Sequence, residues 1–152
     1  IIEEKCEVKL QSLLNHTCDR ILKFLQYSPS YPICNYLTLT CKWGFDGSSS
    51  QSRYKQKWTT SEISDESIFV TSLVPLELIN DTTKEIIWKN SRPSSTRFCR
   101  PIRLQWLQET IITSKKEEQY INQQINNLES FVSNNCKVKF SLTLTMIDGK
   151  VI

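Results

Sequence analysis

The spacing of apolar side chains predicts a helix over residues 3–27. Apolar positions in this segment recur every three or four residues, as on one face of a helix, and comprise Cys6, Leu10, Leu13, Leu14, Cys18, Ile21, Leu22 and Leu25. Glu3 and Glu4 lie in the predicted first turn, where the helix dipole favours negative charge. The sequence Ser28-Pro29-Ser30-Tyr31-Pro32 ends the pattern.

Alternation of apolar and polar residues predicts strands in other parts of the chain. The first strand covers residues 36–43, a hairpin partner returns over 54–58, and a third strand covers 137–145. The motif Leu-Thr-Leu-Thr occurs in both the first and the last of these strands, so we expect the two to pair across the core. Residues 67–88 fit a short strand followed by a helix with Pro75 near its first turn.

The longest stretch that fits a helix runs from Cys99 to Cys136. It contains no glycine, and Pro101 suits the first position of a helix. Apolar positions form one stripe over 102–111 and another over 121–132, with the polar run 115–119 between them. The segment is therefore either one long helix or two helices that meet at this polar run.

Composition favours one soluble domain over residues 1–152. A chain of 152 residues with 39% hydrophobic residues has the size and the apolar content for one core. The net charge of +3 is spread without a basic stripe, so we expect no nucleic-acid partner. No apolar run approaches the ~20 residues that span a bilayer, so we expect no membrane insertion.

The cysteines and two glycosylation sequons point to a secreted, extracellular protein. The sequons begin at Asn15 and Asn80, and an even number of cysteines is typical of disulfide frameworks in an oxidising compartment. We expect all six cysteines to form disulfides: Cys6, Cys18, Cys34, Cys41, Cys99 and Cys136. Their spacing does not resemble a zinc site, so we expect no metal.

No catalytic arrangement is visible in the sequence, so we expect a protein that is not an enzyme and needs no cofactor. His16 is the only histidine and lies within a sequon. The chain has no glycine-rich phosphate loop and no known nucleophile motif. Acidic pairs such as Glu117-Glu118 stand in polar runs, where carboxylates are usually solvated.

Several fragments resemble interleukin-4-type cytokines. Residues 5–11 (KCEVKLQ) resemble the start of the first helix in that family, 33–40 (ICNYLTLT) the strand that follows it, and 97–100 (RFCR) a cysteine-bearing helix start. Residues 107–110 (LQET) are also similar to the ligand of the Fms-like receptor tyrosine kinase. The resemblance implies a mainly α, short-chain four-helix bundle with a small β component, and a Cys6–Cys136 disulfide.

The function that this resemblance implies is that of a secreted signalling ligand for cell-surface cytokine or growth-factor receptors. As an alternative fold, the strand patterns fit an α+β domain with an antiparallel sheet on long helices. The corresponding function is that of a viral or parasite immune-evasion protein that binds and blocks a host immune protein. Candidate partner-binding residues are charged positions beside the apolar stripes: Lys9, Asp19, Arg20, Arg100, Arg103 and Glu109.

Overall fold

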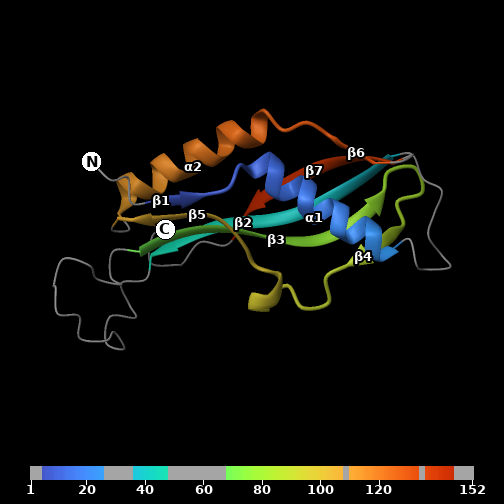
Figure 1. The fold of residues 1–152 in the computed structure, drawn as a ribbon, viewed down its shortest axis with the longest axis horizontal. Coiled ribbons are helices and arrows are strands. Elements are labelled where there is room, and N and C mark those ends of the chain that lie inside the picture. The colour runs from blue at the N-terminus through green and yellow to red at the C-terminus, as the bar shows by residue number, and fades with distance from the viewer. Residues whose placement is uncertain (1–4, 26–35, 48–67, 108–109, 134–135, 146–152) are drawn as a thin grey trace.

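The computed structural model describes residues 5–25, 36–47, 68–107, 110–133 and 136–145 (Figure 1). The elements follow one another as β1 (Lys5–Glu7), α1 (Leu10–Leu25), β2 (Tyr36–Gly47), β3 (Ile68–Asn80), β4 (Ile86–Lys89), a short 3-10 helix (Thr96–Phe98), β5 (Arg100–Trp106), α2 (Ile111–Asn126), β6 (Phe131–Ser133) and β7 (Cys136–Leu144). Within these ranges the chain is richer in strand than in helix.

The described strands form one curled sheet in the order β1-β5-β3-β2-β7-β6, and β4 also pairs with β3. Strands β2 and β7 run parallel, and the other pairs of the described sheet are antiparallel. The chain passes from β2 outward through β3 to β5, and then crosses back through α2 and β6 to reach β7 on the other side of β2. The sheet is therefore mixed, with a helical crossover leading to its parallel pair.

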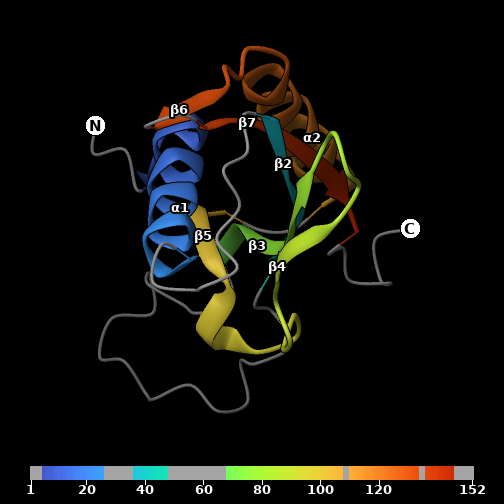
Figure 2. The ribbon, with the colours of Figure 1, turned by 90° about the vertical axis from the view of Figure 1, so that its right-hand side faces the viewer.

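Both helices pack against the same core (Figures 1 and 2). Leu10, Leu14 and Cys18 of α1 are fully buried, and Ile121 of α2 belongs to the same cluster. Strand β2 contributes alternate residues, Leu37, Leu39, Cys41 and Trp43, because side chains along a strand point to opposite faces. The apolar stripe predicted for α1 is thus the face that covers the sheet.

The expected four-helix bundle is wrong. Among the described residues there are two α-helices, each of 16 residues, and the rest of the regular structure is mostly strand. The segment expected to be helical from Cys99 to Cys136 instead contains β5, α2 and β6. Helix α2 begins only at Ile111, where the side chain of Thr110 accepts a hydrogen bond from the backbone N–H of Thr113 and caps it.

The polar run 115–119 lies inside one helix, α2, and is not a joint between two helices, but α2 covers only Ile111–Asn126 and not the whole expected segment. The alternative fold, an antiparallel sheet on long helices, is wrong as well, because β2 pairs in parallel with β7. The segment 68–88 does contain two elements, but both are strands, β3 and β4, so the expected helix is wrong; Pro75 lies where the β2–β3 register shifts. The predicted strand 54–58 lies outside the described residues.

Two strand predictions are confirmed. Strand β2 includes the predicted residues 36–43, and β7 covers most of 137–145. The predicted pairing of the two is also confirmed, with Leu37 beside Val138 and Leu39 beside Phe140 in the parallel register. Helix α1 falls within the predicted 3–27, but residues 5–7 belong to β1, which pairs with β5.

The disulfide framework is wrong for the cysteines that the structure describes. None of Cys6, Cys18, Cys41, Cys99 and Cys136 is in a disulfide, and Cys34 lies outside the described residues. Cys6 is exposed on β1, whereas Cys136 is buried where β7 begins, so the implied Cys6–Cys136 link is absent. Cys18 and Cys41 pack in the core as small apolar side chains.

We expect the exposed thiol of Cys6 to react with alkylating reagents and the buried thiols of Cys18 and Cys41 to be unreactive in the folded protein. Burial raises the pKa of Cys18 and of Cys41 from 9.0 to about 12, so neither thiol ionises at neutral pH in the folded protein. Alkylation with iodoacetamide followed by mass spectrometry should modify exposed Cys6 first and leave Cys18 and Cys41 unmodified until denaturant is added. Protection of all three against the reagent in denaturant, reversed by a reductant, would restore the disulfide interpretation.

No helix in the described ranges is long and apolar enough to cross a membrane.

Candidate functional site

The order of the strands reverses between β2 and β7. After β2 the chain continues to β3 and β5, which lie on one side of β2 in the sheet. It later returns as β7, which lies on the other side of β2. Their arrowheads both point to the left in Figure 1. In open, mostly parallel α/β sheets, ligands bind outside the carboxyl ends of the strands at such a reversal, and β2 and β7 are the parallel pair of the described sheet. The carboxyl ends of β2 and β7 therefore form a candidate ligand-binding site.

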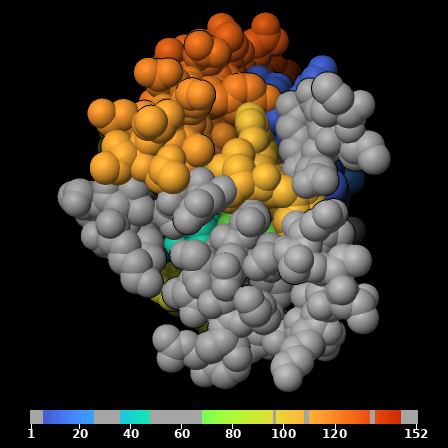
Figure 3. Space-filling model, turned by 90° about the vertical axis from the view of Figure 1, so that its left-hand side faces the viewer, coloured from blue at the N-terminus to red at the C-terminus, as the bar shows by residue number. Residues whose placement is uncertain are grey.

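Asp46 is the penultimate residue of β2 and is exposed at this edge. It is paired in register with Val70 of β3, so its backbone belongs to the rigid part of the sheet. Figure 3 shows this end of the molecule, where a small part of β2 is visible at the surface. A carboxylate held on a strand in this way has a more fixed position than one on a loop.

Aromatic side chains support the strand behind Asp46. Phe45 stacks on Phe69 of β3 with ring centroids 5.5 Å apart, and Trp43 lies 6.2 Å from Phe45. All three rings are buried, at 3% exposure or less. Since side chains alternate along a strand, Asp46 projects from the face opposite to Trp43 and Phe45. The core therefore fixes the strand, and Asp46 is exposed on the other face of it.

The sequence provides a second carboxylate near the end of β7. Asp148 follows Leu144, the last residue of β7, by four positions, and like Asp46 it precedes a glycine. Asp148 lies outside the described residues. Within the described ranges no group of three or more His, Cys, Asp or Glu side chains is arranged to hold a metal ion.

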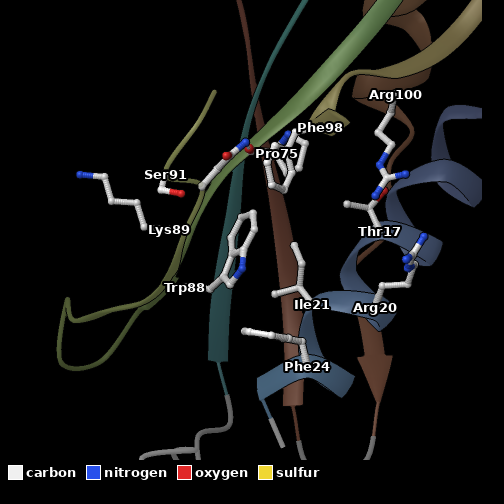
Figure 4. A pocket seen from close by; sticks show the side chains of 11 residues that line it. Thr17, Arg20, Ile21, Phe24, Pro75, Trp88, Lys89, Ser91, Phe98 and Arg100 are labelled. Carbon is white, nitrogen blue, oxygen red and sulfur yellow. Dashed lines mark hydrogen bonds between the residues drawn. The ribbon is translucent and has the colours of Figure 1, made fainter. Parts of the chain in front are cut away.

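A separate pocket of about 420 Å³ lies between α1 and the β3–β4 hairpin. We call it the α1–β4 pocket, and it is lined by Thr17, Arg20, Ile21, Phe24, Pro75, Trp88, Lys89, Asn90, Ser91, Phe98 and Arg100. In Figure 4, Ile21 and Phe24 lie opposite Trp88, and Pro75 and Phe98 close one end. Its lining combines an apolar interior with cations, and contains no acidic residue.

A polar network lies beneath α2, apart from the carboxyl end of β2 and from the α1–β4 pocket. The buried carboxylate of Glu117 accepts a hydrogen bond from the hydroxyl of Thr71 on β3 and lies 3.6 Å from Nε of Arg103 on β5. The Arg103 guanidinium also stacks over the ring of Tyr120, 4.2 Å from its centroid. The Tyr120 hydroxyl donates to Glu7 at 2.7 Å, and this bond is the main cause that raises the pKa of Tyr120. The network ties α2 to the sheet.

The six predicted partner-binding residues do not form one surface. Arg20 and Arg100 both line the α1–β4 pocket. The sequence predicts these two arginines on two separate helices. Arg100 and Arg103 are on strand β5 instead of a helix, and Arg103 belongs to the network beneath α2. Lys9 is exposed just before α1, and Asp19 pairs with Lys23 at 2.9 Å. Glu109 lies outside the described residues.

The two sequons have different surroundings. Asn15 is half-buried on α1, and its Oδ1 accepts a hydrogen bond from the side chain of Gln11. Asn80 is only 7% exposed, and its Oδ1 accepts from the backbone N–H groups of Thr82 and Thr83. A glycan is bulky and solvated, so a glycan at Asn80 requires this turn to open.

Comparison with known proteins identifies no relative. No family model matches the chain, and no curated protein matches it.

Proposed function

We propose that the chain holds a divalent cation at the carboxyl end of β2 and uses it on a phosphate ester. The observation that carries this proposal is the position of Asp46, exposed at the end of a central strand where the strand order reverses. Carboxylates are the ligands that Mg²⁺ and Mn²⁺ prefer. In the sequence, Asp148 follows the last residue of β7, the parallel neighbour of β2, by four positions, but it lies outside the described residues.

A site with few protein ligands is typical of Mg²⁺ in phosphoryl transfer. Such an ion is bound by one or two carboxylates, and water and the phosphate oxygens of the substrate complete its coordination. When bound, such an ion would supply positive charge against the negative charge that develops on the phosphate and would lower the pKa of a coordinated water. Asp46 would hold the ion, and water together with the phosphate oxygens of the substrate would complete its coordination.

This proposal departs from the expectation of a secreted protein that is not an enzyme. The cytokine-like function depended on a four-helix bundle, and the disulfides were the main support for secretion; the structure contains neither among its described residues. Binding of another protein remains a proposal, and the α1–β4 pocket is the surface that supports it. Both functions are compatible with one chain, because the two places lie on different elements.

The ion dependence of phosphate-ester binding tests this function. We expect the affinity for a fluorescently labelled oligonucleotide, or for a nucleoside monophosphate, to rise at least about tenfold when Mn²⁺ is added and to fall back with EDTA. Fluorescence anisotropy measures the affinity for the oligonucleotide, and isothermal titration calorimetry measures the affinity for the nucleoside monophosphate. Comparing the two affinities shows whether the site prefers a polymer or a small substrate. Affinities that are the same with Mn²⁺ and with EDTA for both ligands would contradict the proposal.

A further inference from the structure

We infer that the α1–β4 pocket binds an acidic peptide segment of a partner protein that carries a large apolar side chain. This inference is independent of the cation site, because none of its lining residues lies at the ends of β2 or β7. It rests on three features of the pocket: its apolar interior, an exposed aromatic residue, and cations without counter-ions.

The interior of the pocket fits one apolar side chain. Ile21 and Trp88 face each other across it, and Pro75 and Phe98 close one end (Figure 4). A volume of about 420 Å³ lies within the range of sites that bind specific ligands. Two polar side chains of the lining already have partners: the Thr17 hydroxyl donates to the carbonyl of Leu13, and Asn90 donates to that of Pro75. The interior therefore favours an apolar group over a polar one.

Phe24 is an aromatic side chain that this fold leaves uncovered. It is 70% exposed at the edge of the pocket, although α1 buries seven of its other side chains against the sheet. Exposed aromatic and arginine side chains together are enriched in protein–protein interfaces, where they contribute much of the binding energy. A small molecule confined to the interior would leave Phe24 in water, whereas a peptide crossing the edge would cover it.

Two arginines beside the pocket have no ion-pair partner among the described residues. Arg20 of α1 and Arg100 of β5 lie on the same side of the pocket, and neither forms an ion pair within the described part of the chain. Nε of Arg100 is buried with no hydrogen-bond acceptor in these ranges. The acidic residue next to Arg20 in the sequence, Asp19, is paired with Lys23. Carboxylates that flank the apolar side chain of a partner would supply the missing acceptors.

Two synthetic peptides test this inference by NMR titration. The probe is a short peptide with one phenylalanine flanked by glutamates, and the matched control has lysines in place of the glutamates. We expect the acidic peptide to cause saturable shifts at Thr17, Ile21 and Trp88, and the basic peptide to cause none. Equal binding of both peptides, or no saturable shift with either, would overturn the inference.

Charge reversal at the edge gives a second readout that a folding defect would not imitate. Arg20 is exposed, so Arg20→Glu should leave the fold intact, weaken the acidic peptide at least about tenfold and strengthen the basic one. Lys116→Glu makes the same change of charge at an exposed position on α2 and should change neither affinity. If phenylacetate alone binds as tightly as the acidic peptide, the pocket is a small-molecule site and the peptide proposal is wrong.

Discussion

Asp46→Asn is expected to abolish the binding of Mn²⁺ and the ion-dependent increase in phosphate-ester affinity. The amide has nearly the shape of the carboxylate but no charge, and Asp46 is exposed at the end of β2, so the fold should not change. Loss of residues that only orient a metal ligand costs about 10–100-fold in metal affinity, so loss of a ligand itself should cost at least about 100-fold. Isothermal titration calorimetry with Mn²⁺ measures this loss.

Asp81→Asn is the matched control for this change. Asp81 follows β3 and lies beside the amino end of β2, since its backbone N–H donates to the carbonyl of Tyr36. Its Oδ1 accepts from the hydroxyl of Thr38, and the amide of an asparagine can still accept this bond. We expect Asp81→Asn to bind Mn²⁺ as the unchanged chain does. Equal loss in both variants would mean that Mn²⁺ responds to net charge and not to the strand end.

Arg103→Met is expected to destabilise the protein by about 3–5 kcal/mol, because it leaves a buried carboxylate without its cation. The side chain of Glu117 is 2% exposed, and that of Arg103 is 13% exposed. After the substitution, Glu117 keeps the hydrogen bond from Thr71 but loses its charge partner. The loss of the stacked guanidinium also removes the contact with Tyr120. Chemical denaturation of the variant and the unchanged chain measures the difference in free energy of unfolding.

A second substitution separates lost charge from lost packing. In the double variant Arg103→Met with Glu117→Gln, the buried charge is gone, so most of the lost stability should return. Arg97→Met, at an exposed position in the 3-10 helix, should change the free energy of unfolding by about 0.5 kcal/mol or less. If Arg103→Met is as mild as Arg97→Met, the network beneath α2 does not hold the helix to the sheet.

The sequence predicts the elements whose pattern has one clear period. The three- and four-residue spacing in α1 is unambiguous, and the alternation in β2 and β7 is equally clear. Strand β5 is different, because Ile102 and Trp106 are four residues apart as well as on one side of an alternating pattern. A short apolar segment of this kind fits both periods, and only its pairing with β3 and β1 decides for strand.

The candidate sites depend on which distant segments lie side by side. The local pattern of apolar and polar residues does not predict those pairings. Arg20 and Arg100 can each be selected as exposed charges, but only the position of β5 beside α1 brings them to one pocket. Asp46 precedes Gly47, and an Asp-Gly pair after a strand normally indicates a turn. Its position at the carboxyl end of a parallel pair follows only from the placement of β7 beside β2.

The cation site itself is tested most directly by paramagnetic broadening with Mn²⁺. The two ends of the β2–β3 pair provide an internal comparison, because Phe45, Gly47 and Val70 lie at the carboxyl end of β2, and Tyr36 and Asn80 lie at the other end. We predict that low concentrations of Mn²⁺ broaden the amide resonances of the first three residues and leave the other two sharp. Broadening centred on Asn80 and Asp81, or no saturable broadening at either end, would contradict the account.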